Sequence, residues 1–288
     1  MKVLKNRLIP VVLMRGGICV QSKGFRRYQR LGNPTQIVER LSDWASDELI
    51  YLDISGDEDY DLGREDLRDG NCEGPLEILT EIAQRCFMPL TFGGRIRSLQ
   101  DIADRIRRGA DKVSLNTHVL DQPEFINQAA EEFGSQCIVV NVDARREGED
   151  WEAYADGGCR ATGKSAAHWA QEAQDRGAGE ILIQSIDRDG RGAGYDIDLV
   201  RSITSTVQIP VIALGGAGTW QHMEEVLTHG GARAVAAANI FNYTENSVFN
   251  AKQHLFDHHC KVRQPIMGVR GFKSVSYTHL RAHETNVD

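Results

Sequence analysis

The chain has 288 residues, 41% of them hydrophobic, and a formal net charge of -8 at pH 7. This acidic balance argues against nucleic acid or an anionic membrane as a general partner, because both attract basic surfaces. No apolar run approaches the roughly 20 residues of a membrane span, and no signal-peptide core is evident, so we expect a cytoplasmic protein with reduced cysteines.

Strand-like and helix-like segments alternate along the chain. Eight short runs rich in Val, Ile and Leu have the composition of strands buried on both faces: Leu8–Met14, Leu49–Ile54, Pro89–Phe92, Lys112–Leu115, Cys137–Val142, Ile181–Ile186, Val211–Leu214 and Ala234–Ala238. Helical patterns fill the gaps, with a start signal at Asn33-Pro34 and helix ends at Gly109 and Gly177. Long loops follow three of the strands, on the side that normally forms the site: Arg15–Gly32, Ser55–Gly74 and Arg145–Gly163.

Two stretches of the chain share one pattern. The first runs from Met88 to Thr117 and the second from Ile209 to Asn239. Each has a buried strand, a Gly-Gly turn, a helix, a Gly-Ala turn and a second buried strand. Such a repeat implies two homologous halves. Together with the eight strands, it predicts a (β/α)8 TIM barrel built from two half-barrels, in a single domain over residues 1–268.

The end of the chain does not follow this pattern. Residues 269–288 have no hydrophobic period, and they are either a disordered native tail or a non-native sequence. Several residues near this end could suggest a metal: His254, His258, His259, Cys260, His279 and His283. No carboxylate partner or tetrahedral spacing accompanies them, so neither a metal site nor a cofactor is predicted.

The Gly-Gly turns predict phosphate binding. Glycine lets backbone N–H groups approach an oxyanion closely, and the start of the next helix adds its positive end. Two turns at equivalent positions imply a ligand with a phosphate at each end, or one site kept and one lost. Arg95, which follows the first turn, either contacts the ligand or crowds the site. The predicted phosphate- and substrate-binding residues are Gly93, Gly94, Asn116, Thr117, Gly215, Gly216, Ala238 and Asn239.

Aspartates at the ends of strands are the candidates for acid–base chemistry. Asp143 ends a strand and should point into the barrel mouth, where it can transfer protons; the alternatives are a loop cap or a partner for Arg145. Asp53 is similar, with a stronger structural alternative. The turn Asp187-Arg-Asp189-Gly190 resembles the start of a calcium loop but lacks the glutamate at the twelfth position, so we expect it to hydrogen-bond a polar ligand instead.

Four charged residues stand at the amino-terminal starts of predicted strands: Arg7, Glu48, Lys112 and Glu180. Two cations and two anions from four strands can meet as a ring around the barrel floor. The alternative is four ordinary surface charges, each of which contributes little to stability. Because their positions are so regular, we expect the ring.

Several motifs resemble the cyclase subunit of imidazole glycerol phosphate synthase, from about Arg7 to about Arg263. They are the two Gly-Gly turns, Ser-Ile-Asp-Arg-Asp-Gly, Gly-Ala-Gly-Glu-Ile-Leu, Gly-Ala-Asp-Lys-Val-Ser and the segment Phe133–Gln136. The resemblance implies a heterodimer with a glutaminase of the class I amidotransferase type. Ammonia from the glutaminase would pass the floor ring and travel inside the barrel to a substrate with two phosphates. It also implies an acid–base role for Asp143 and an ammonia-gating role for Arg7, Glu48, Lys112 and Glu180.

The chain departs from that family at two important positions. The catalytic aspartate of the first strand falls at Leu13, and the lysine expected to hold a substrate phosphate falls at Gln21. Loss of a general acid or base costs about 10² to 10⁴ in rate, so ordinary cyclase activity should be gravely impaired.

Three runs are more similar to a specialised branch: Ile9–Met14, Cys86–Leu99 and Ile209–Gly218. That branch works with a glutaminase and a sugar amidotransferase in bacterial surface-polysaccharide pathways, where ammonia converts an acetamido sugar into an acetamidino sugar. The sequence therefore predicts an ammonia-conducting synthase subunit that acts on a phosphorylated or nucleotide-sugar substrate. The alternatives are a cyclase of histidine biosynthesis with a relocated acid, and a non-catalytic barrel that only activates its glutaminase.

Overall fold

The structure, a computed structural model, describes residues 5–55 and 74–266. Within these residues, eight parallel strands form the barrel: β1 (Arg7–Arg15), β4 (Leu49–Asp53), β5 (Leu90–Gly93), β6 (Lys112–Leu115), β7 (Ile138–Glu147), β10 (Glu180–Ser185), β11 (Val211–Leu214) and β12 (Ala234–Ala237). The barrel closes where β12 pairs in parallel with β1, in the register Arg7 to Ala234. The predicted (β/α)8 TIM barrel is confirmed.

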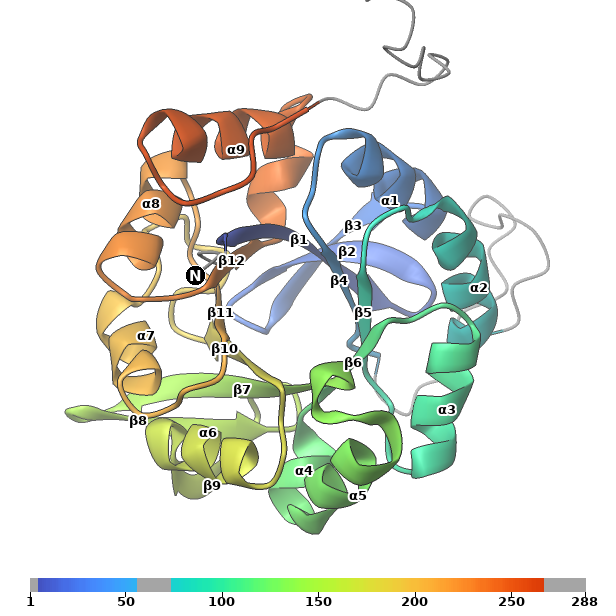
Figure 1. Cartoon of the computed structure of the whole chain (residues 1–288), viewed down its shortest axis with the longest axis vertical. Coiled ribbons are helices and arrows are strands. Elements are labelled where there is room, and N and C mark those ends of the chain that lie inside the picture. Colours follow the sequence, from blue (N-terminus) through green and yellow to red (C-terminus); the bar gives the residue numbers. More distant parts are fainter. Residues whose placement is uncertain (1–4, 56–73, 267–288) are drawn as a thin grey trace, which may run out of the picture.

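The helices form a ring outside the strands, as the view down the barrel shows (Figure 1). They are α1 (Pro34–Asp43), α2 (Pro75–Arg85), α3 (Leu99–Arg107), α4 (Thr117–Asp121), α5 (Glu124–Phe133), α6 (Ala166–Asp175), α7 (Ile197–Thr204), α8 (Trp220–Thr228) and α9 (Ser247–Asp257), with 3-10 turns η2 (Ser135–Cys137) and η3 (Asn239–Asn242). Helix α1 begins as predicted, because the side chain of Asn33 accepts a hydrogen bond from the Thr35 N–H and Pro34 occupies its first turn. No helix among the described residues is long and apolar enough to cross a membrane.

Two of the three segments predicted as loops are β-hairpins. Strands β2 (Ile18–Lys23) and β3 (Arg27–Gly32) extend antiparallel from β1, and β8 (Asp150–Ala155) and β9 (Arg160–Ser165) extend in the same way from β7. The long connections expected there contain regular strands, because β1 and β7 continue beyond the barrel rim and pair with the chain that follows them. Antiparallel pairing satisfies the backbone groups of those extensions. The third segment, Ser55–Gly74, lies almost wholly outside the described residues.

The core has two layers, separated by the strands. Along β1, the side chains of Leu8, Val12 and Met14 pack in the large cluster between the barrel and the helices. The alternate residues Ile9 and Val11, with Leu13, pack in a smaller cluster inside the barrel. Side chains of successive strand residues point to opposite faces, which explains this division and why the strand sequences show no polar–apolar alternation.

Candidate active site at the barrel mouth

Asp143, the predicted acid or base, lies in the middle of β7, where the strand leaves the barrel and begins to pair with β8, and it is only 3% exposed. The Asn116 side-chain N–H group donates a hydrogen bond of 2.7 Å to its Oδ2, and that of Asn141 donates one of 3.2 Å to its Oδ1. Burial raises the pKa of Asp143 to about 7, and the charge of Asp189 acts in the same direction, although both hydrogen bonds oppose the shift. A carboxyl group with this pKa can accept or donate a proton near neutral pH.

Asp143 and Asp53 were each given a structural alternative to acid–base chemistry, and the structure separates the two residues. Arg145 does not serve as the partner of Asp143, since its guanidinium donates to the Gly158 carbonyl oxygen at 3.0 Å and lies over the Tyr154 ring. Asp53, by contrast, caps its own loop by accepting a hydrogen bond from the Ser55 N–H at 3.0 Å. This capping matches the structural alternative given for Asp53.

The raised pKa of Asp143 predicts a pH-dependent stability. The folded protein keeps this proton up to about pH 7, whereas the unfolded chain loses it near the ordinary value of 3.8. Stability therefore falls as pH rises between these two values and levels off above the higher one. From about pH 5 to 8, the free energy of unfolding should fall by about 2 to 3 kcal/mol through this group. Urea unfolding of Asp143→Asn should lack that part of the slope, and an equal slope in both proteins would contradict the prediction.

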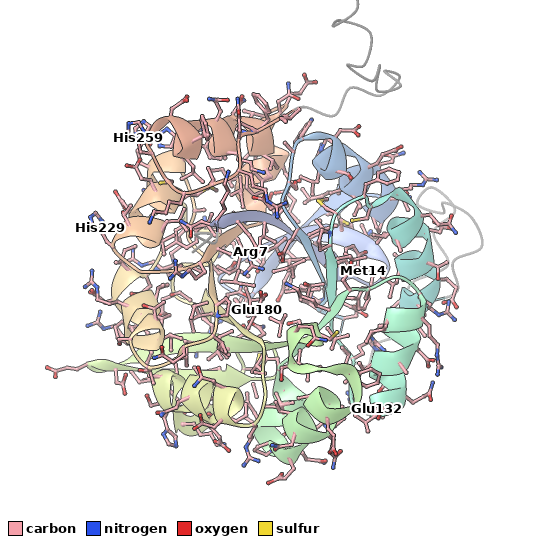
Figure 2. All side chains as sticks on the ribbon, viewed as in Figure 1. Arg7, Met14, Glu132, Glu180, His229 and His259 are labelled. Atoms are coloured by element: carbon pink, nitrogen blue, oxygen red, sulfur yellow. The ribbon has the colours of Figure 1, made fainter. Side chains whose placement is uncertain are left out.

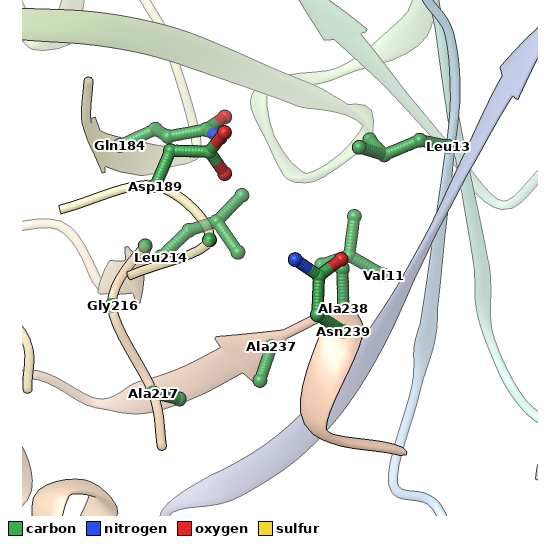
Figure 3. Close-up of a pocket in the computed structure, with 12 residues that line it drawn as sticks. Val11, Leu13, Gln184, Asp189, Leu214, Gly216, Ala217, Ala237, Ala238 and Asn239 are labelled. Carbon is green, nitrogen blue, oxygen red and sulfur yellow. The ribbon is translucent and has the colours of Figure 1, made fainter. Parts of the chain in front are cut away.

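Leu13 stands where a second proton carrier would be expected. It is 7% exposed and packs in the apolar cluster inside the barrel. It also lines a pocket of about 390 Å³, part of which is open to solvent. Figure 3 shows Leu13 pointing into this pocket from β1, with Gln184 and Asp189 on the opposite side. A leucine here can exclude water but cannot transfer a proton.

The second Gly-Gly turn forms one wall of this pocket, which is lined by Gly215, Gly216, Ala217, Ala238 and Asn239. Gly216 has a φ of +100°, and a side chain there would overlap the Gly194 carbonyl oxygen, so the turn requires glycine. Asn239 donates to the Ser22 carbonyl oxygen at 2.8 Å, which holds the β2–β3 hairpin beside the pocket. The residues predicted for the second phosphate site are thus brought together around an open space.

The first Gly-Gly turn has different surroundings. Gly94 has a φ of +103°, and a side chain there would overlap the carbonyl oxygen of Asp53. The side-chain amide of Asn116 is bound to Asp143, and the Thr117 hydroxyl accepts the Asp156 N–H at 2.9 Å. The side chains of Asn116 and Thr117 therefore form hydrogen bonds within the protein at the turn where phosphate binding was predicted. Gly93 is packed tightly between strands, with Leu52 and Ser114 too close to admit a side chain.

This asymmetry predicts where an oxyanion binds first. In crystals grown with sulfate or phosphate, the anion should appear at the Gly215-Gly216 turn beside Asn239, because that turn keeps its small residues and lines the pocket. The turn carrying Gly94 and Arg95 should bind later or not at all. Difference density checks this prediction, and an anion only at the Gly94 turn would reverse the ranking of the two halves.

The turn after β10 holds both hairpins. The Asp189 carboxylate accepts the Ser22 hydroxyl at 2.7 Å and the Phe25 N–H at 3.2 Å, and it also lines the pocket. Asp187 accepts the Arg146 N–H at 2.9 Å. A side chain at Gly190 would overlap the Ser22 carbonyl oxygen, so the hairpin packs directly on this turn. These carboxylates support the site wall, and a ligand contact from them stays a prediction.

Three polar residues at the mouth were not among the predicted site residues. Asn141 lies on the same face of β7 as Asp143. Gln184 lies on the neighbouring strand β10, directly opposite Asp143. The Ser185 hydroxyl and the Asn141 amide oxygen are buried and have no hydrogen-bond partner among the described residues. Buried polar atoms normally have partners, so the Asn141 amide oxygen, on the same strand face as Asp143, suits a polar ligand, whereas Ser185 lies on the face of β10 opposite Gln184. The two-residue spacing of Asn141 and Asp143 was the available sequence signal.

Gln21 occupies the position at which a phosphate-binding lysine was expected. Gln21 lies on β2, and its amide oxygen accepts a hydrogen bond of 3.4 Å from the Tyr243 hydroxyl. Tyr243 is 67% exposed, so this contact lies at the rim. Gln21 is neutral and cannot replace the charge of a lysine toward a phosphate.

The four charged residues at the opposite end form a closed ring. Arg7 Nη1 lies 2.7 Å from Glu48 Oε1 and 2.9 Å from Glu180 Oε1. Lys112 Nζ lies 3.2 Å from the Oε2 atom of each glutamate. Figure 2 places Arg7 and Glu180 near the barrel axis. The four side chains are between 11% and 17% exposed, and each anion contacts both cations, so no charge is left alone.

The expectation that the histidines near the end of the chain lack a carboxylate partner is wrong. A carboxylate partner does exist for His254 of α9 and for His258, the residue that caps this helix, because Glu224 of α8 contacts both of them. The preceding helix supplies this group, which local spacing could not reveal. His279 and His283, and with them the tail 269–288, lie outside the described residues.

The closed parallel barrel defines the chain as a (β/α)8 protein, and its buried carboxyl group makes the mouth the candidate site. Residues 7–247 match a protein-family model described as "Histidine biosynthesis protein". The chain belongs to this family of histidine biosynthesis enzymes.

Proposed function

We propose that this protein is the ammonia-conducting synthase subunit of a glutamine amidotransferase, and that it serves acetamidino-sugar formation in surface-polysaccharide biosynthesis in the cytoplasm. The single observation that carries the proposal is the closed ring of Arg7, Glu48, Lys112 and Glu180. Four partly buried charges across a barrel floor give little net stability, because desolvation offsets their attraction. A role in controlling passage accounts for them better than a structural role.

The barrel interior supports a path from this ring to the mouth. Along β7 the inward residues after the floor are Val139, Asn141 and Asp143, and along β10 they are Leu182 and Gln184. Among the described residues, the interior directly above the ring therefore carries no charge: Val139 and Leu182 are apolar, and Ser114, which pairs with Val139, and Asn141, which pairs with Leu182, are neutral polar residues. Ammonia reacts as the neutral molecule, and a buried passage without carboxylates favours the neutral form over ammonium.

The mouth supports a reaction other than ordinary cyclisation. Asp143 keeps a proton-carrying group, whereas Leu13 removes the second one. Delivery of ammonia to a sugar at the mouth needs a passage and an exit, but not two acid–base groups in the barrel. We propose a phosphorylated or nucleotide-sugar substrate, with its phosphate at the Gly215-Gly216 turn.

A second candidate is the cyclase reaction of histidine biosynthesis. It is favoured by the family match over residues 7–247 and by glycine turns at equivalent positions in both halves. This candidate requires another residue to replace the proton carrier at Leu13. Asp189 is a candidate for this replacement, since its carboxylate lines the same pocket as Leu13. That carboxylate, however, already accepts hydrogen bonds from the Ser22 hydroxyl and the Phe25 N–H.

The proposal requires a heterodimer with a glutaminase docked over the ring. Phe87, next to β5 at the amino-terminal end of the barrel, is 89% exposed, and large exposed apolar side chains are typical anchors of interfaces. Phe87→Asp should weaken binding to a class I glutaminase from the same genome by tenfold or more, about 1.4 kcal/mol or above, in titration calorimetry.

A matched control for this experiment is Tyr243→Asp at the opposite rim, which should leave glutaminase binding unchanged. If the glutaminase binds neither the unaltered barrel nor its variants, the proposed function is wrong. If Tyr243→Asp weakens binding and Phe87→Asp does not, the partner docks at the mouth and the floor cannot receive its ammonia.

A further inference from the structure

The outer helices α8 and α9 bring together two imidazoles and a carboxylate away from the candidate active site. His254 is in the last turn of α9 and His258 is the C-cap residue, whose backbone N–H still bonds the His254 carbonyl oxygen, so the two side chains leave the same side of the helix end. Glu224 comes from α8, which packs against α9. In Figure 2, His229 and His259 mark this outer edge of the molecule, far from Arg7 and Glu180 at the barrel axis.

The three side chains converge on a small volume. Glu224 Oε2 lies 3.2 Å from His254 Nε2 and 2.9 Å from His258 Nδ1. One donor atom from each of the three residues lies within 4.8 Å of the others. In a tetrahedral site with bonds of about 2.0 to 2.2 Å, neighbouring donor atoms are about 3.3 Å apart. Small side-chain rotations would therefore create a metal-binding geometry.

We propose that Glu224, His254 and His258 bind a divalent first-row transition-metal ion, with Zn²⁺ as the preferred ion. Two imidazole nitrogens and a carboxylate oxygen are the donors that such ions favour over Mg²⁺ or Ca²⁺. Three protein ligands leave at least one position for water or for a donor from another molecule. The side chains are 17%, 48% and 29% exposed for His254, His258 and Glu224, so an ion can enter from solvent.

A proton is the other species that could bridge these groups. If one of the two histidines were protonated, its imidazolium would form an ordinary hydrogen-bonded ion pair with Glu224. Here the two imidazole rings stack with centroids 4.0 Å apart, and a nitrogen of each ring faces the same carboxylate oxygen. Two protonated rings at that distance would repel one another, so without a metal at least one ring would be a neutral tautomer that donates its N–H to the carboxylate. A divalent ion would instead be coordinated by both ring nitrogens and by the carboxylate oxygen.

Such an ion would fasten the last helix of the barrel. α9 is already held at the floor by Lys252, whose ammonium lies 2.7 Å from the buried Asp47 carboxylate and 2.9 Å from the Ala45 carbonyl oxygen. The proposed ion adds a second attachment, between α9 and α8. An ion that binds only the folded protein raises its stability by mass action.

The test is titration of the reduced full-length protein with Zn²⁺ alone, by calorimetry and by thermal unfolding. We expect one Zn²⁺ per chain at this site and a rise in Tm of several degrees at saturation. Each of Glu224→Gln, His254→Gln and His258→Gln should weaken binding by at least about tenfold, since even residues that only support metal ligands have effects of that size. The rise in Tm should be lost in the same variants.

Matched controls separate this site from other histidines and thiols. His259→Asn removes the adjacent imidazole at a residue with a φ of +60°, which asparagine tolerates. The double variant His279→Gln/His283→Gln removes the histidines beyond residue 266. Cys260→Ser tests the nearby thiol, whose pKa is raised by burial and by Glu224. All three should keep the Zn²⁺ affinity. Unchanged affinity in the Glu224, His254 and His258 variants, or equal losses in the controls, would overturn the proposal.

Discussion

Supplied with ammonia and the two-phosphate cyclase substrate, the purified barrel should form little or no imidazole product. Its rate should be about 10² to 10⁴ lower than that of an ordinary cyclase, because Leu13 cannot take part in acid–base catalysis. Leu13 is buried in the apolar cluster inside the barrel and faces the pocket (Figure 3), so a side chain that cannot carry a proton borders the candidate site. Absorbance of the product checks this directly.

Substitution at the same residue sharpens the result. Leu13→Asp should restore part of the cyclase activity if the rest of the site still accepts that substrate. Leu13→Asn is the matched control, since asparagine is close to aspartate in size and is also polar but cannot transfer a proton. Folding of both variants is followed by circular dichroism, because a polar group replaces a buried leucine. Turnover by the unaltered protein comparable to an ordinary cyclase would rule out the sugar-amidination proposal.

Lys112→Met should uncouple glutamine hydrolysis from ammonia transfer. The ammonium group of Lys112 contacts Glu48 and Glu180, so its loss leaves Arg7 as the only ring cation for two carboxylates. We propose Lys112 as the moving gate, because its flexible side chain can leave both glutamates while Arg7 still holds them. The excess negative charge would attract ammonium and water to the floor, so less neutral ammonia would reach the mouth.

The measurement is the ratio of ammonia transferred to glutamine hydrolysed in the assembled enzyme. That ratio should fall in Lys112→Met while hydrolysis continues. Lys112→Arg keeps the charge and should retain most of the coupling. Arg107→Met, a variant at a side chain 69% exposed on α3, controls for loss of a positive charge elsewhere. Unchanged coupling in Lys112→Met would remove the ring from the proposed passage.

Strand composition and repeats were sufficient to predict the barrel. The apolar runs are buried on both faces, as β1 illustrates with Leu8 outside and Ile9 inside, which indicated a parallel sheet covered by helices, and the count of eight strands with the internal repeat indicated a barrel. The floor ring was predictable because each of its residues begins a strand, and closure of the barrel brings strand starts together. Both predictions depended on register within strands, which local sequence specifies well.

Contacts between distant segments were harder to predict. The hairpins after β1 and β7 contain polar, glycine-rich sequence that is typical of loops, and their pairing depends on strands that leave the rim together. Asp189 was identified as a polar residue of the mouth, but its bond to Ser22 joins residues 167 positions apart. Glu224 likewise meets His254 only through packing of α8 on α9. The raised pKa of Asp143 comes from burial, which a single residue type does not indicate.

The most direct test of the central claim is an isotope-competition measurement on the complete enzyme. The barrel, its glutaminase and the sugar amidotransferase are given glutamine labelled with ¹⁵N in the side-chain amide, together with excess unlabelled ammonium chloride and a nucleotide acetamido sugar. If ammonia travels inside the barrel, the acetamidino product should carry mainly ¹⁵N, as mass spectrometry would show. A product whose label matches the mixed pool in solution would mean that ammonia reaches the sugar through solvent, and the barrel would not be an ammonia conduit.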